Sequence, residues 1–278
     1  TKYANFESPS TIGVYAGSYE NIGTTLDINR VLNDNWAIRL VGEKSDTNSF
    51  RDGIGANEEM ISPSITYRND DKTLLWTTEF TYDDLTRVPD RGPSYDNLPD
   101  GTSIKMGFSQ DNDYVKDILK TARTDIKYEF APGWNFHWGL SHREAEQNFD
   151  HFYSGSICKA DKTPTSTDKG CYKGYINQTY YWQQTTNKTT ANTWDISGEF
   201  ITGGIKHNVL VGTDWTYEQR EPLLSNKNQD GSLIYGFVNP LTGDRFSNRG
   251  NGHIITSHNY NEGTNYGVFL QDLVSFND

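Results

Sequence analysis

Apolar and polar residues alternate along about ten segments of this chain, and this alternation limits its fold more than any other feature. Leu74, Trp76 and Phe80, for example, alternate with Thr77 and Glu79. A period of two is that of a β-strand whose two faces meet different surroundings. We therefore predict an all-β, antiparallel protein, with strands at about 11–17, 22–32, 35–46, 57–68, 73–83, 118–130, 134–150, 176–201, 205–219 and 264–276.

The connections between these segments alternate in length. Short turns, such as 33–35 and 69–72, are followed by long polar connections at about 84–117, 151–175 and 220–262. Long strands with short turns at one end and long loops at the other are typical of a transmembrane outer-membrane β-barrel. A soluble β-protein also alternates and is the competing interpretation. The barrel is favoured by rings beside the short turns, where an interfacial girdle lies: Trp36, Tyr67, Trp76, Tyr128, Phe130, Trp134 and Phe276.

The alternation also predicts which side chains face lipid. A slip by one residue would place charge in hydrocarbon, at a cost of roughly 2–4 kcal/mol for each Arg or Lys near the middle of the membrane. We expect Arg39, Glu43 and Glu79 to face the lumen. The residues expected to face lipid are Trp36, Ile38, Leu40, Leu74, Trp76 and Phe80.

Composition excludes several other classes of protein. Lys plus Arg total 25 and Asp plus Glu total 37, so the net charge is −12, and nucleic acid is not an expected partner. The mean hydropathy is −0.76, and no run approaches the roughly 18 apolar residues of a membrane helix. We find no motif for catalysis or for metal binding, and we expect neither an enzyme nor a cofactor.

The only two cysteines, Cys158 and Cys171, lie in one polar connection. Such a pair indicates a disulfide formed in an oxidising compartment. Two free thiols that happen to be close in sequence are the alternative.

Large rings are frequent in the long connections, and four are candidate ligand contacts: Tyr95, Tyr153, Tyr235 and Phe237. Their connections lie on one side of the predicted barrel, so folding can gather them into a cup for a bulky, partly apolar ligand. Packing between loops is the alternative for any single ring. The three connections carry −3, +2 and 0 charges, which sum to −1, so whole-loop counting predicts no basic mouth for a strongly anionic ligand.

Several stretches resemble TonB-dependent siderophore receptors. They are Gly17-Ser18-Tyr19-Glu20, Thr25-Leu26-Asp27-Ile28-Asn29, Pro89-Asp90-Arg91-Gly92, residues 205–214 and Gly267-Val268-Phe269-Leu270-Gln271-Asp272. The resemblance runs in order along nearly the whole chain. It implies a 22-stranded barrel with an N-terminal plug, of which residues 1–278 would be the N-terminal half of the barrel, about its first ten strands. The plug and the C-terminal half are not in this sequence. We interpret Ser275-Phe276-Asn277-Asp278 as the start of a turn that leads to a further strand.

The resemblance implies ferric-siderophore uptake across the bacterial outer membrane. The expected partners are the ferric siderophore, TonB acting through the plug, and outer-membrane lipid and lipopolysaccharide. The cysteine pair resembles that of ferrichrome-type hydroxamate receptors, in which a ligand-contacting tyrosine precedes the first cysteine by five; Tyr153 matches it, while Gly155 replaces a second aromatic. Two alternatives stay open: a TonB-dependent receptor for another metal chelate or a cobalamin, and a self-contained ten-stranded barrel enzyme.

Overall fold

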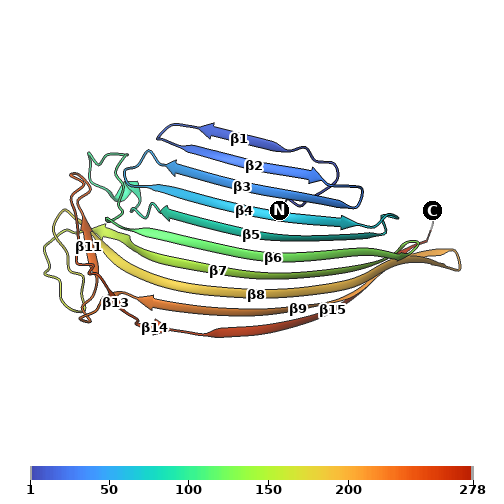
Figure 1. Ribbon diagram of the computed structural model, residues 1–278. Coiled ribbons are helices and arrows are strands. Elements are labelled where there is room, and N and C mark those ends of the chain that lie inside the picture. Colours follow the sequence, from blue (N-terminus) through green and yellow to red (C-terminus); the bar gives the residue numbers. More distant parts are fainter. Residues whose placement is uncertain (1, 277–278) are drawn as a thin grey trace.

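Ten long antiparallel strands in chain order form one curved sheet in the computed structural model, which describes residues 2–276. The long connections gather at one end of the sheet and the short turns at the other (Figure 1). The strands are β1 (Thr11–Ala16), β2 (Ile22–Val31), β3 (Trp36–Asn48), β4 (Gly55–Arg68), β5 (Leu74–Val88), β6 (Tyr114–Ala131), β7 (Trp134–Ile157), β8 (Ile176–Thr202), β9 (Ile205–Ser225) and β15 (Asn261–Ser275).

Short elements occupy the long connections. The 3-10 helix η1 (Tyr95–Asn97) lies between β5 and β6. β11 (Tyr235–Val238) pairs with the loop end of β8 and with β12 (Arg245–Ser247). β10 (Lys227–Asn228) pairs with β13 (His253–Ile254), and β14 (Ser257–His258) pairs with β9. The connection between β9 and β15 is therefore folded onto the neighbouring strands.

The ten predicted strands are confirmed, but several of them extend further toward the loops than predicted. β7 ends at Ile157 rather than near residue 150, and β9 ends at Ser225 rather than near 219. Cross-strand pairing satisfies the backbone hydrogen-bonding groups of a hairpin beyond the membrane. The strands can therefore continue there without alternating apolar and polar residues. Tyr153 therefore lies on the extended β7. Tyr235 and Phe237 lie on β11, a strand inside the connection expected at 220–262 that was not predicted.

The two faces of the sheet differ as the alternation predicts. Arg39, Ser64 and Glu79 lie opposite one another across β3, β4 and β5, on a face that we call the inner face. Arg39 and Glu79 are 8% and 5% exposed, whereas Ile38 and Phe80, on the opposite face, are 40% and 44% exposed. The predicted assignment of lipid-facing and lumen-facing residues is confirmed for these strands.

The aromatic girdle beside the short turns is also present. The Trp36 and Tyr67 ring centroids are 4.7 Å apart, and those of Trp36 and Trp76 are 6.2 Å apart. These rings lie on the outer face near the short turns, where the amphipathic side chains of an interfacial belt are favoured.

The segment before β1 lies against the inner face. The Arg39 guanidinium binds the Asp27 carboxylate at 2.6 and 2.7 Å and donates to the Tyr3 carbonyl at 2.9 Å. The Ala4 amide donates to Ser64 Oγ at 2.9 Å, and Thr66 donates to the Ala4 carbonyl at 2.7 Å. The polar inner face therefore holds an extended segment through specific hydrogen bonds.

The sheet is open at both edges. Within residues 2–276, β1 is hydrogen-bonded only to β2, and β15 only to β9. The alternative of ten strands that close on themselves is therefore wrong for this structure. The predicted turn at the chain end includes Asn277 and Asp278, which lie outside the described residues. In the described part of the chain, no helix is long and apolar enough to cross a membrane.

Candidate ligand-binding site

Two of the four predicted ligand contacts lie in one row across three strands. Tyr153 on β7 is opposite Thr179 on β8, and Thr179 is opposite Tyr235 on β11. Residues paired across antiparallel strands point to the same face, and two strand spacings separate the tyrosine backbones by about 10 Å. Thr179 between them is exposed. The row is thus an accessible surface with a ring at each end.

The row belongs to the inner face. Arg123 on β6 is opposite both Glu79 and Ser141 on its two neighbouring strands, so Ser141 is an inner-face residue. Steps of two residues along β7 lead from Ser141 to Tyr153 without a break in the register. Tyr153 therefore points toward the interior at the end of the sheet where the long connections lie.

An aromatic cluster surrounds Tyr153. Its ring centroid is 4.6 Å from that of His151 and 6.0 Å from that of Tyr181. The Arg91 guanidinium lies 4.7 Å from the Tyr153 ring centroid, which is a cation–π contact. His151 is buried, and its Nδ1 lies 3.2 Å from the Phe152 carbonyl. His151 therefore contributes a buried ring to this cluster.

The other predicted contacts have different surroundings. Phe237 is 1% exposed and packs between Tyr172, at 4.6 Å, and Tyr235, at 5.8 Å between ring centroids. Tyr95 is 53% exposed on η1, and its hydroxyl donates to the Thr102 carbonyl at 3.1 Å. Among the described residues, no ring contact joins Tyr95 to the other three. The structure brings Tyr153, Tyr235 and Phe237 into one region and leaves Tyr95 apart.

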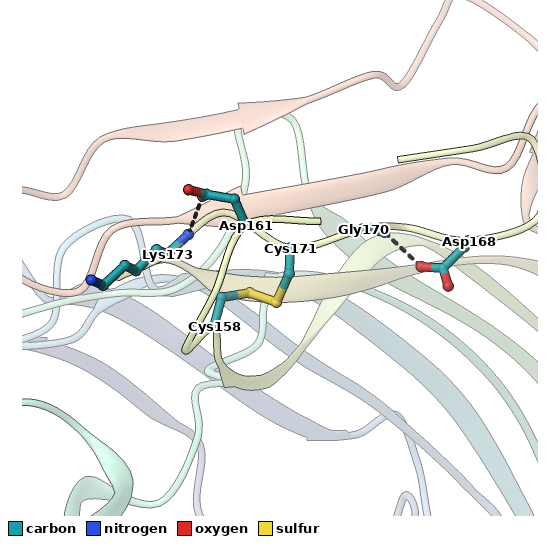
Figure 2. The surroundings of a disulfide bond; sticks show 6 residues. All are labelled: Cys158, Asp161, Asp168, Gly170, Cys171 and Lys173. Carbon is teal, nitrogen blue, oxygen red and sulfur yellow. Dashed lines mark hydrogen bonds between the residues drawn. A yellow bond between two sulfur atoms is a disulfide. The ribbon is translucent and has the colours of Figure 1, made fainter. Parts of the chain in front are cut away.

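The disulfide predicted between Cys158 and Cys171 is confirmed, with an S–S distance of 2.02 Å. Figure 2 shows it with two backbone contacts of the same loop: the Lys173 amide donates to Asp161, and the Gly170 amide donates to Asp168, each at 2.8 Å. The bond and these contacts hold the loop over the end of β8.

Lys169 extends from this loop to the row. Its Nζ donates to Thr179 Oγ1 at 2.7 Å, and burial lowers the pKa of its ammonium group. The disulfide loop thereby places a cation between the two tyrosines.

The opposite face of β7 and β8 is covered by other connections. Arg249 Nη1 lies 3.0 Å from Asp113 Oδ1 and 2.9 Å from Asp150 Oδ1. Burial raises the pKa of Asp113 to about 7, although Arg249 and two backbone amides act against this shift. Gln110 Nε2 donates to Gln178 Oε1 at 2.6 Å. The candidate site is therefore backed by a layer of buried polar contacts.

Sequence reasoning missed Lys169, Thr179, Arg91 and His151 as residues of this site. His151 became part of the site only because β7 continues past the predicted end near residue 150. The contact between Lys169 and Thr179 depends on how the disulfide loop folds back, and no local pattern indicates it.

No known family profile matches the sequence, but comparisons with individual proteins find relatives of the chain. The chain is 22% identical over 296 residues to the ferrioxamine receptor of Yersinia enterocolitica, covering 100% of this chain and 38% of that receptor. It is 21% identical over 229 residues to the metal-pseudopaline receptor CntO of Pseudomonas aeruginosa, covering 81% of this chain and 30% of that receptor.

Among solved structures, the ferric-catecholate import receptor Fiu of E. coli K12 superposes with a TM-score of 0.81 at 17% identity. The match covers 99% of this chain and 40% of that receptor. This chain thus spans about two fifths or less of the length of the proteins it matches. The fold is that of a siderophore-receptor barrel, seen in part, and the predicted resemblance to TonB-dependent siderophore receptors is confirmed.

The relatives also indicate the class of protein and its location in the cell. They are receptors rather than enzymes. The fold is shared with a pyoverdine outer membrane receptor of Pseudomonas aeruginosa, at a TM-score of 0.76 and 15% identity over 98% of this chain and 39% of that receptor. Together with the apolar outer face and the aromatic girdle, this confirms the predicted location in the bacterial outer membrane. The cargoes in their names, ferrioxamine, metal-pseudopaline and ferric catecholate, do not favour the ferrichrome-type subgroup.

Proposed function

We propose that residues 1–278 form the N-terminal half of the barrel of a TonB-dependent receptor that takes up ferric siderophores across the bacterial outer membrane. A plug domain and the C-terminal half of the barrel complete this receptor. The observation that carries the proposal is the row of Tyr153, Thr179 and Tyr235, because it opens onto the inner face of a receptor-type sheet at its loop end.

The cargo chemistry suits this surface. A ferric siderophore has a bulky, largely carbon exterior around anionic oxygens, so rings can pack on it and phenol hydroxyls can donate to its oxygens. Below the row, the inner face is polar along whole strands, which suits passage of a hydrated chelate. TonB, acting on the plug, supplies the energy, and the barrel carries out no covalent chemistry and holds no cofactor of its own. Outer-membrane lipid and lipopolysaccharide surround the apolar outer face.

The four proposed ligand contacts differ in their roles. Tyr153 and Tyr235 contact the chelate directly, because both rings are half-buried on the inner face. Phe237 packs against Tyr235 and fixes its position. Tyr95, which is exposed on η1, meets the chelate only from the rim.

The test is a chelate titration of the full-length receptor. Tyr153→Ala should lose about 1–2 kcal/mol of binding, roughly a tenfold loss of affinity. Tyr128→Ala, in the girdle at the other end of the sheet, is the matched control and should bind as the parent does. Unchanged affinity of the Tyr153→Ala receptor, at normal surface expression, would leave Tyr153 as a loop-packing residue.

A receptor for a different metal chelate is the second candidate. It is favoured by the similarity to a protein named as a metal-pseudopaline receptor. Uptake assays with iron, nickel and zinc chelates distinguish the two candidate functions. A receptor for ferric siderophores supports growth only on the iron chelate.

A further inference from the structure

Two cations lie beside the row of Tyr153, Thr179 and Tyr235 without carboxylate partners. Lys169 Nζ binds the Thr179 hydroxyl at 2.7 Å. The Arg91 guanidinium lies over the Tyr153 ring at 4.7 Å. Within residues 2–276, no carboxylate oxygen lies within 4.0 Å of either cationic group. Both positive charges are therefore available to a ligand on the row.

The nearest acids in sequence are paired elsewhere. Asp168, next to Lys169, forms an ion pair with Lys162, and its attraction to Lys169 acts from beyond 4.0 Å. Asp90, next to Arg91, forms an ion pair with Arg51 at 3.0 Å. The summed loop charge of −1 therefore conceals a local excess of positive charge at the row.

The position of Lys169 is fixed by its loop. The Cys158–Cys171 bond closes the loop, and the Gly170 amide donates to the carboxylate of Asp168 (Figure 2). Gly170 has a φ of +70°, and a Cβ there would lie 2.6 Å from the Lys162 carbonyl oxygen. Only glycine fits this turn without strain. A cation placed in advance loses less conformational freedom when it binds a ligand.

We propose that Lys169 and Arg91 form an anion subsite, and that the receptor prefers chelates that present a carboxylate or another exposed anionic oxygen. The inference rests on the proposed function and names the charge class of its cargo. A half-buried ammonium without a carboxylate gains most from an anionic acceptor, because charge-assisted hydrogen bonds are the stronger ones. The ring of Tyr153 holds the Arg91 guanidinium at one end of the row, and Thr179 holds Lys169 at its centre.

The experiment measures affinity for three chelates that share one iron-binding core. Ferrioxamine B carries a free amine and one positive charge, its N-acetyl form is neutral, and its N-succinyl form carries one negative charge. We expect the full-length receptor to bind the succinyl form tightest and the amine form weakest. Lys169→Met should weaken the succinyl form about tenfold and leave the amine form unchanged or tighter, as expected for loss of one partner of an ion pair.

Two further variants complete the design. Lys159→Met removes the same charge from an exposed position of the same loop and should keep the order of the three affinities. Lys169→Arg should restore the preference for the succinyl form. Thiol labelling before and after reduction shows whether each variant retains the disulfide.

Equal affinity for the three chelates, or a preference for the amine form, overturns the subsite while the proposed function stands. An equal loss for all three in Lys169→Met also overturns it, because Lys169 then acts only in packing. If no chelate binds and no iron chelate supports growth, the proposed function itself is wrong. A succinyl preference that Lys169→Met removes and Lys169→Arg restores supports the subsite.

Discussion

Arg249 Nη1 lies 3.0 Å from Asp113 Oδ1, which joins two connections 136 residues apart in the sequence. The Asp113 side chain is 2% exposed, so removal of the cation leaves a buried carboxylate without its ion-pair partner. At pH 8, we expect Arg249→Gln to destabilise this loop layer by about 3 kcal/mol or more. Hydrogen exchange of the Phe152 amide, which donates to Asp113 at 3.3 Å, measures the effect.

Lys105→Gln is the control for Arg249→Gln, since Lys105 is exposed in the same layer. It should leave the exchange rate of the Phe152 amide unchanged. Equal exchange in all three proteins would show that Arg249 does not hold the layer.

The pKa of Asp113, raised by burial to about 7, predicts a pH dependence. Between about pH 4 and pH 7, the folded layer keeps a proton on Asp113 that the unfolded chain has lost. The unfolded state thus binds fewer protons, and the stability of the layer falls as pH rises through this range. Exchange of the Phe152 amide, corrected for its intrinsic rate, should show this fall between pH 5 and pH 7. Asp113→Asn should flatten it, and an equal slope in that variant contradicts the assignment.

Reduction of the Cys158–Cys171 bond should loosen the loop that carries Lys169. The bond spans a separation of 13 residues, and closing a loop of this size restricts its unfolded state by about 3 kcal/mol in the entropy model. Amide exchange at Gly174, which donates to the Cys158 carbonyl at 2.9 Å, should accelerate after reduction. The double variant Cys158→Ser, Cys171→Ser should exchange at the reduced rate and show no further response to reductant.

The two faces of β3 give a matched pair of substitutions. Leu40→Arg places a charge on the outer face and should cost about 2–4 kcal/mol of folding stability in lipid. Val41→Arg places the same charge on the inner face, opposite Asp27, and should be nearly neutral. Denaturant unfolding of the full-length receptor in vesicles measures both. Equal costs for the two variants would show that Leu40 and Val41 do not face different surroundings.

The sequence predicts the part of the fold that depends on local pattern. Period-two alternation identified all ten long strands and placed Trp36 and Arg39 on opposite faces, because lipid and lumen impose opposite chemistry on neighbouring residues. The alternation is no guide beyond the membrane, where loops rather than lipid cover the outward side of the strands. The continuation of β7 through Tyr153 and the pairing of β11 with β8 depend instead on tertiary contacts.

The placement of the candidate site was predictable only in part. The resemblance to ferrichrome-type receptors pointed to Tyr153 through its spacing to Cys158, and Tyr235 was proposed from its place in a long connection. The burial of Phe237 beneath Tyr172 and Tyr235 was not predictable, since nothing in the sequence distinguishes a ring that meets a ligand from one that packs. The charge summed over each whole loop does not reveal that Lys169 lies at Thr179.

The open edges of the sheet determine what a further strand must look like. β1 and β15 each present unpaired backbone groups, and beside them Val14 and Val268 are 73% and 84% exposed. Such edges are templates on which a further strand can pair. A strand added at either edge continues the facing of its neighbour, so its apolar residues must align with Val14 or Val268, and a register error of one residue would turn them toward the inner face.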